Sequence, residues 1–263
     1  MLQSKIGSLV DLDLTCTASS AKTLSIHGEM IDCIPLQEVE SSKGFDLIVH
    51  LAFLLPKASL DIQIQEYEAI NSSILELVKD IFDNNPQALK LVLSSGAVEN
   101  SNKVNHSELM KSYSLLKHNM ETALSGSQSL VIRLWSATGH HIPLDSDYAL
   151  ANFINAARLG REIVIRNNVN RTFVSVQELL HIALEFLCQG GRGCINSGGS
   201  TVSLVELADL IVKSIHSESK IRVENFTTSK NLHYVSPKSE FPENFSNRFS
   251  PIQSQVERAV MGK

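Results

Sequence analysis

The sequence predicts an α/β protein built on a parallel sheet. Three short apolar runs, at 46–52, 89–93 and 130–134, have the length and the Leu, Ile and Val content of buried strands. Between them lie two longer segments, 61–83 and 108–124, whose apolar residues recur at helical spacing. Strands that alternate with long helices are joined by crossover connections, so these strands should run parallel.

The helix expected over 61–83 carries more apolar residues than one core-facing stripe requires. We therefore expect it to have a second buried face, as in a subunit interface. Asn84, Asn85 and Pro86 follow directly and predict where this helix ends, because Pro cannot continue a helix.

After Gly139 the predicted elements become shorter, and we expect a smaller C-terminal unit there. The expected elements are a helix over 147–159, a strand over 162–165, a strand end or loop running into a helix over 174–187, a helix over 202–215, and mostly loop over 236–254. Ser203 and Glu206 stand three residues apart at the start of the last helix, which is the spacing of a capping box.

Composition and charge exclude several classes of protein. The 263 residues carry 23 basic and 28 acidic side chains, a net charge of -5, so no basic excess is present to bind nucleic acid. No apolar run approaches the roughly 18 residues of a membrane span, and residues 1–7 lack the pattern of a signal peptide. The four cysteines show no C-x-x-C spacing. We therefore expect no disulfide framework, no metal, no membrane partner and a cytoplasmic location.

Three residues indicate proton-transfer chemistry. Tyr113 and Lys117 are four residues apart in a predicted helix, so both side chains should lie on one face. A nearby ammonium favours the phenolate and would lower the pKa of Tyr113 from its ordinary value of about 10. Such a phenol can accept a proton from a substrate hydroxyl. Ser95 directly follows a predicted strand, at the end of a parallel sheet where ligands bind.

These features occur in a characteristic order along the chain. The matching pieces are 28–32, 46–52, Asn71, 94–98, Tyr113 with Lys117, 133–139, 147–154, 171–176 and 196–198. Together they resemble the extended short-chain dehydrogenase/reductase superfamily, and within it the NAD-dependent nucleotide-sugar epimerase/dehydratase family. The resemblance runs from about residue 24 to 215, with a looser similarity to the end.

The resemblance implies a Rossmann-type doubly wound parallel sheet over 1–140, with an incomplete N-terminal unit. A small α+β lobe over 141–263 would form most of the substrate site. NAD or NADP is the implied cofactor and a nucleotide sugar the implied substrate. The resemblance also implies a homodimer, formed through the helices that carry Asn71 and Tyr113.

Residue roles follow by position in the same family. Tyr113 would be the base, Lys117 its activator and a ribose contact, and Ser95 the partner of the reacting hydroxyl. The implied cofactor contacts are Asp13, Glu29, Met30, Ala52, Asn71 and Lys117. The implied substrate contacts are Ser95, Ser136, Asn152 and Arg171, the last of which would bind the diphosphate.

The largest departure from this family is the absence of a glycine-rich turn before residue 46. Gly7 and Gly28 are the only glycines among the first 43 residues. If 9–14 is the second strand, with Asp11 or Asp13 as the ribose acid, about 25 residues of a strand–turn–helix unit are missing. Alternatively, 9–15 takes the place of the first strand and 15–21 forms a shortened turn.

The residues after Ser95 bear on the reaction. Dehydratases of this family carry an Asp-Glu pair there, whereas this chain has Gly96 and Ala97, which cannot transfer protons. We therefore expect an epimerase or a ketoreductase. The alternatives are a nucleotide-sugar 4,6-dehydratase, and a degenerate homologue that binds a sugar nucleotide or a partner chain without turnover.

Overall fold

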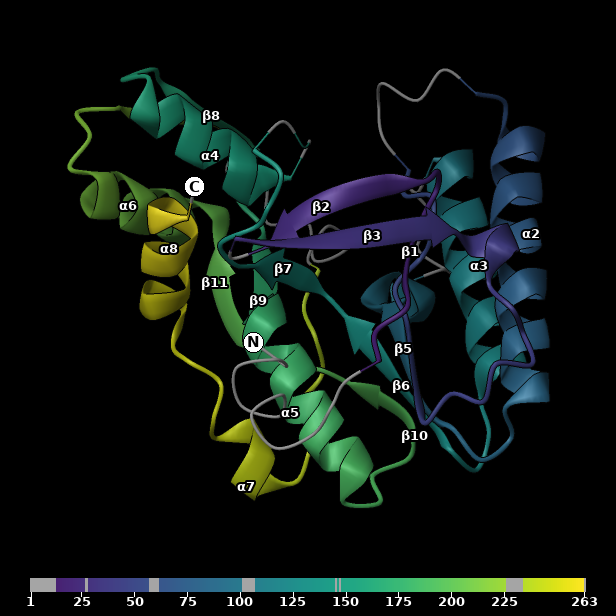
Figure 1. Ribbon diagram of the computed structural model, residues 1–263. Coiled ribbons are helices and arrows are strands. Elements are labelled where there is room, and N and C mark those ends of the chain that lie inside the picture. Colours follow the sequence, from purple (N-terminus) through teal and green to yellow (C-terminus); the bar gives the residue numbers. More distant parts are fainter. Residues whose placement is uncertain are drawn as a thin grey trace.

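Four parallel strands form the central sheet of the protein. The computed structural model describes residues 13–26, 28–56, 62–100, 107–144, 146, 148–225 and 234–262. The strands are β4 (Leu47–His50), β5 (Leu89–Ser95), β6 (Ser129–Leu134) and β10 (Gly193–Asn196), in the order β10-β6-β5-β4 (Figure 1). All neighbouring strands run parallel, which confirms the predicted α/β class.

Helices cover both faces of this sheet. Helices α2 (Ile64–Asn84) and α3 (Glu108–Leu124) pack with Val92 and Val131, whereas α5 (Val176–Cys188) packs with Leu91 and Leu130. Successive residues of a strand point to opposite faces, so α5 lies on the face opposite α2 and α3. The sheet is therefore doubly wound, as the sequence predicted. The predicted bounds of α3 agree with the structure.

The C-terminal lobe has its own hydrophobic core. Its strands are β7 (Ser136–Thr138), β9 (Asn170–Ser175) and β11 (Ser200–Ser203) in one sheet, and β8 (Ile163–Asn167) and β12 (Ile221–Asn225) in another. Its helices are α4 (Ala149–Arg158), α6 (Leu204–Ile215) and α8 (Ile252–Met261), and the short α7 (Glu243–Ser246) packs against the central sheet instead. Buried Leu150, Ile154, Leu207 and Ile211 join α4 to α6 in this core.

Two expectations for this lobe have different outcomes. The capping box of α6 is confirmed, since Ser203 accepts the backbone N–H of Glu206 and the Glu206 carboxylate accepts that of Ser203. The tail is more helical than expected, because α8 begins at Ile252, inside the segment predicted to be mostly loop. Val256 and Ala259 of α8 are buried in the lobe core, and this burial stabilises the helix.

The N-terminal residues form a separate small sheet. Strands β1 (Cys16–Ala18), β2 (Lys22–Ile26) and β3 (Glu29–Pro35) lie in the order β1-β3-β2, followed by the 3-10 turn η1 (Leu36–Glu38). Within the described residues, β4 is thus the edge of the central sheet. The strand predicted over 9–14 lies largely outside the described residues, as does Asp11, and residues 13–15 are not a strand.

The 28–32 segment, one of the pieces that carry the family resemblance, lies in a β-hairpin. Its residues 29–32 form the beginning of β3. Gly28 has a φ of +85°, a conformation that Gly adopts at little cost, and it turns the chain sharply between β2 and β3. Cys16 and Cys33 lie opposite one another on β1 and β3 as free thiols, with their sulfur atoms 3.1 Å apart.

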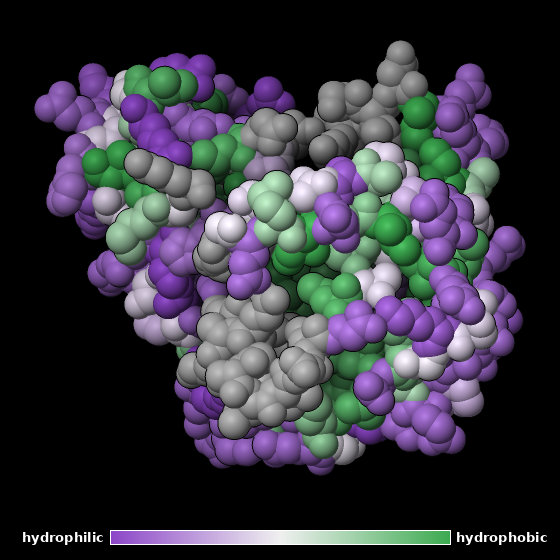
Figure 2. Space-filling model, viewed as in Figure 1, coloured by the Kyte–Doolittle hydropathy of each residue, from purple (hydrophilic) through white to green (hydrophobic). Residues whose placement is uncertain are grey.

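The surface of the face drawn in Figure 1 is mixed. Figure 2 shows apolar side chains gathered over its central part, with polar side chains around them. Among the described residues, no helix is long and apolar enough to cross a membrane.

Candidate active site

Three predicted site residues lie where β5 ends. Ser95 is the last residue of β5 and is buried, and ligands bind at such carboxyl ends in open parallel sheets. Tyr113 and Lys117 are one turn apart on α3, which packs beside β5. Helix α3 begins after Ser107, whose hydroxyl accepts the backbone N–H of Met110 at 3.3 Å. Ser95 is among the side chains close enough to Tyr113 to affect the pKa of its phenol, so the fold brings this predicted pair together.

A second phenol, which the sequence analysis did not identify, reaches the same serine. The Tyr234 hydroxyl lies 3.1 Å from Ser95 Oγ, which also accepts the backbone N–H of Ala97 at 3.2 Å. Its ring packs against Trp135, with the ring centroids 4.8 Å apart. The contact joins residues 139 positions apart, so no local pattern could have revealed it.

The pKa of Tyr113 moves in the direction opposite to our expectation. Burial, with smaller contributions from Tyr234, Tyr148 and Tyr67, raises it above its ordinary value. Burial also raises the pKa of Tyr234 to about 12. Both phenols are therefore protonated at neutral pH, in the form that donates a proton.

Lys117 is buried, and its burial disfavours the charged form of its side chain. Its ammonium donates to the backbone oxygen of Leu93 at 3.1 Å and lies 3.9 Å from the centroid of the Phe53 ring. Burial lowers the pKa of Lys117 to about 7, although Glu121 opposes the shift. The uncharged amine is therefore appreciably populated at neutral pH. The rise in the pKa of Tyr113 comes mainly from burial and not from Lys117.

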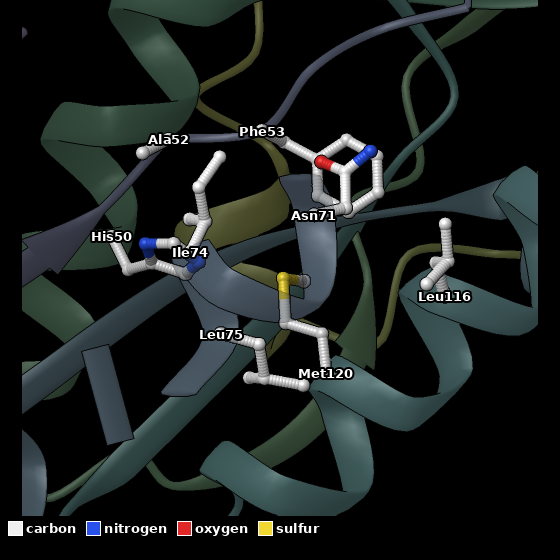
Figure 3. Close-up of a pocket in the computed structure, with 8 residues that line it drawn as sticks. All are labelled: His50, Ala52, Phe53, Asn71, Ile74, Leu75, Leu116 and Met120. Atoms are coloured by element: carbon white, nitrogen blue, oxygen red, sulfur yellow. The ribbon is translucent and has the colours of Figure 1, made fainter. Parts of the chain in front are cut away.

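A small cavity lies beside Lys117. It has a volume of about 10 Å³, enough for about one water molecule, and Figure 3 shows its lining. The lining residues are His50, Ala52, Phe53, Asn71, Ile74, Leu75, Leu116 and Met120. Burial lowers the pKa of His50 to about 4, so its imidazole is neutral.

Asn71, a predicted cofactor contact, binds the protein backbone. Its Oδ1 accepts the Leu54 N–H at 2.8 Å, and its Nδ2 donates to the carbonyl oxygens of Leu54 and Tyr67. These bonds hold the loop after β4 against α2. The structure thus gives Asn71 a role in placing Ala52 and Phe53.

The remaining predicted cofactor contacts lie on the N-terminal segment. Asp13 precedes β1, is largely exposed and forms an ion pair with Lys43 at 3.1 Å. Glu29 and Met30 are exposed at the start of β3. Glu29 and Met30 lie in the small N-terminal sheet, and Asp13 lies just before it. All three are therefore outside the central sheet that carries Ser95.

The predicted substrate contacts lie on the lobe. Ser136 is the first residue of β7, next to Trp135, and Asn152 is exposed on α4. Arg171 of β9 pairs with Tyr234 in a parallel β-bridge. Its buried Nε has no hydrogen-bond partner in the described part of the chain, and burial lowers its pKa. Of these three residues, Arg171 is connected to Ser95, because Tyr234 pairs with Arg171 and its hydroxyl lies 3.1 Å from Ser95 Oγ.

An ion-pair network supports the ends of β5 and β6. Arg133 binds Glu121 at 2.7 Å and Glu99 at 2.9 Å, and Ser94 donates to Glu121 at 2.6 Å. Glu99 also accepts the side-chain amide of Asn196 at 2.6 Å. The carboxylate nearest in sequence to Ser95 is therefore already paired. Among the described residues, no group of His, Cys, Asp and Glu side chains could hold a metal ion.

Gly96 is required by the packing of Trp135. A Cβ at this position would lie 2.3 Å from the Trp135 ring, which is far inside van der Waals contact. We expect Gly96→Ala to reduce the free energy of unfolding by about 1–3 kcal/mol, measured by urea denaturation. Gly126→Ala is the matched control, because the nearest atom would be 3.7 Å away. Equal stability of the two variants would contradict this packing.

The fold defines a Rossmann-type α/β protein, with Ser95, Tyr113 and Lys117 near the end of β5. No family model and no curated protein matches the chain. Solved structures do share its fold. A UDP-N-acetylglucosamine 4-epimerase from Methanobrevibacter ruminantium, solved with UDP-N-acetylmuramic acid, is 19% identical with a TM-score of 0.67, over 86% of this chain and 79% of the epimerase.

Two further structures contain nicotinamide cofactors. WbmH from Bordetella bronchiseptica, solved with NAD+, is 19% identical with a TM-score of 0.62, over 82% of this chain and 74% of WbmH. RMD from Pseudomonas aeruginosa, solved with NADPH, is 17% identical with a TM-score of 0.62, over 82% of this chain and 79% of RMD. At these identities the likeness shows the fold, and it confirms the Rossmann-type architecture expected from the sequence.

Proposed function

We propose that this protein is an NAD(P)-dependent epimerase or ketoreductase of a nucleotide sugar, acting in the cytoplasm. The observation that carries the proposal is the position of Ser95 at the end of β5, near Tyr113, with Lys117 one turn further along α3. The likeness to proteins solved with UDP-sugars, NAD+ and NADPH supports both the substrate class and the cofactor class.

Each candidate site residue would have its own role in this reaction. Ser95 would hold the reacting oxygen of the sugar, and Tyr113 would move a proton to or from that oxygen. NAD(P), when bound, supplies or accepts the hydride. Lys117 would stabilise the Tyr113 phenolate while charged. The guanidinium of Arg171 would bind the diphosphate, for which its unpaired Nε provides a donor, and Ser136 and Asn152 would contact the sugar nucleotide.

Redox chemistry at one carbon fits the site better than dehydration. Elimination of water requires an additional acid or base beside the sugar. Ala97 is buried and apolar, Gly96 leaves no room for a side chain, and Glu99 is paired with Arg133 and Asn196. We therefore place the 4,6-dehydratase reaction behind epimerisation and ketone reduction.

The assay that tests this function uses several sugar nucleotides. The protein is incubated with UDP-, GDP- and dTDP-sugars and their 4-keto derivatives, with NAD(H) or NADP(H), and products are identified by proton NMR. A C4 epimer or a reduced 4-keto sugar would support the proposal. Release of a 4-keto-6-deoxy sugar from an unmodified sugar would contradict the ranking of reactions.

A non-catalytic homologue is the second candidate, and one observation favours it. The ammonium of Lys117 is covered by Phe53, and the hydroxyl of Ser95 is engaged by Tyr234. Binding of a sugar nucleotide without any product in the NMR assay would support this candidate.

We expect the 263-residue chain to bind NAD(H) weakly. A dinucleotide pyrophosphate binds to backbone N–H groups at a helix N-terminus after a glycine-rich turn. Among the described residues ahead of β4, the only helical segment is the three-residue η1. Isothermal titration calorimetry tests this expectation with NADH and NADPH. A Kd below about 1 μM would show that another part of the chain forms the phosphate site.

We also propose that the chain forms a homodimer through α2 and α3, which lie side by side (Figure 1). Ile70 of α2 and Leu115 of α3 are 38% and 57% exposed. Burial of such side chains would stabilise a twofold interface. We expect a dimer mass in light scattering and a monomer mass for the double variant Ile70→Lys, Leu115→Lys. A monomer mass for the unaltered protein would contradict the proposal.

A further inference from the structure

The hydroxyl of Ser95 already has two hydrogen-bond partners among the described residues. A serine hydroxyl donates one hydrogen bond and accepts two. Ser95 Oγ accepts the Ala97 N–H at 3.2 Å and lies 3.1 Å from the Tyr234 hydroxyl. These two partners use two of the three hydrogen bonds that Oγ can form. A substrate oxygen that takes the place of either partner must displace it.

Of the two partners, Tyr234 is the one whose departure leaves the strand unchanged. The Ala97 N–H belongs to the backbone directly after β5, so it cannot move without changing the end of the strand. Tyr234 carries no role in the proposed reaction.

The backbone of Tyr234 is held in place independently of its hydroxyl. Its N–H donates to the Asn170 carbonyl at 3.0 Å, and its carbonyl accepts the Thr172 N–H at 3.1 Å. The ring packs against Trp135, and Ser95 is the partner of the hydroxyl among the described residues. A change of side-chain rotamer would therefore free Ser95 without breaking the backbone hydrogen bonds.

We propose that Tyr234 is an internal competitor of the substrate: its hydroxyl occupies the position of the reacting substrate oxygen on Ser95. This inference rests on the proposed function, because it assigns that position to a sugar oxygen. The apparent affinity for substrate is reduced by the fraction of molecules in which Tyr234 is bound to Ser95. Removal of the Tyr234 hydroxyl should therefore tighten sugar binding.

The first experiment tests whether Tyr234 and Ser95 interact in solution and needs no ligand. Ser95→Ala, Tyr234→Phe and the double variant are compared by urea denaturation in a double-mutant cycle. We expect Tyr234→Phe to lower the unfolding midpoint less in the Ser95→Ala background than in the unaltered protein. Tyr67→Phe is the matched control, since the buried Tyr67 hydroxyl has no hydrogen-bond partner among the described residues. Strict additivity of Ser95→Ala and Tyr234→Phe would overturn the inference.

The second experiment measures binding by calorimetry with UDP and UDP-N-acetylglucosamine as probes. GDP and GDP-mannose replace them if the uridine pair does not bind. We expect Tyr234→Phe to bind the sugar nucleotide about tenfold more tightly than the unaltered protein, the effect of one hydrogen bond. Affinity for the free diphosphate should not change, because it lacks the sugar. Tyr67→Phe should bind both probes as the unaltered protein does.

The outcomes separate the inference from the function on which it rests. Sugar-nucleotide binding that is equal or weaker in Tyr234→Phe would overturn the inference and leave the proposed function in place. Failure of both the unaltered protein and Tyr234→Phe to bind any of the four probes would contradict the proposed function, and the inference with it. Binding that appears only in Tyr234→Phe would support both.

Discussion

Replacement of Tyr113 by Phe is expected to reduce turnover of a nucleotide sugar by a factor of about 10²–10⁴, the usual effect of losing a general acid or base. The Phe ring retains the contact with Phe53, where the two rings meet edge to face at 5.7 Å. The value of KM should therefore change little while kcat falls. Steady-state kinetics on a substrate identified by the NMR assay provides the measurement.

Two other tyrosines serve as controls for this variant. Tyr67→Phe removes a buried hydroxyl that has no partner among the described residues, so its kcat should equal that of the unaltered protein. Tyr234→Phe removes the other phenol on Ser95 and should not lower kcat if Tyr113 carries the proton. A fully active Tyr113→Phe together with an inactive Tyr234→Phe would transfer the proton-carrying role to Tyr234.

Lys117→Met is expected to abolish most activity without a loss of stability. The ammonium is needed to stabilise a Tyr113 phenolate, so we expect a decrease in kcat similar to that of Tyr113→Phe and a shift of activity to higher pH. Burial of this ammonium is unfavourable, as the lowered pKa of about 7 shows. Methionine fills a similar volume without a charge. The variant should therefore be at least as stable as the unaltered protein at neutral pH.

The same pKa predicts how stability depends on pH. Lysine in an unfolded chain has a pKa of about 10.4. Between about pH 7 and pH 10 the unfolded state therefore binds more protons at this position than the folded state, and stability should rise with pH. Urea denaturation at several pH values in this window measures the rise, which should be smaller in Lys117→Met. Identical pH dependence in both proteins would show that Lys117 is solvated in solution.

The sequence predicted the central sheet because the physical signals there are local. Buried parallel strands read as continuous apolar runs, and the runs at 89–93 and 130–134 lie within β5 and β6. The spacing of Tyr113 and Lys117 predicted a shared helix face, and Ser203 with Glu206 predicted the capped start of α6. Each of these depends on residues within a few positions of one another.

The N-terminal segment shows where local signals fail. No partner for β2 was predicted from the sequence, and the structure pairs it with β3 across the turn at Gly28, in a sheet separate from β4. Helix α8 was missed for a related reason. It is short, and it is stabilised by the burial of Val256 and Ala259 in a core assembled from distant segments.

The sequence by itself determined the fold class, the strands and helices of the central sheet and the spacing of Tyr113 and Lys117 on one helix, since these follow from periodicity and spacing. Only the tertiary structure decided the chemical state of the candidate site. Burial raises the pKa of Tyr113 and lowers that of Lys117. Phe53 covers the ammonium, and Tyr234 reaches Ser95 from 139 positions away. A pKa depends on desolvation and on the groups that surround a side chain in space, and those are set when distant segments pack together.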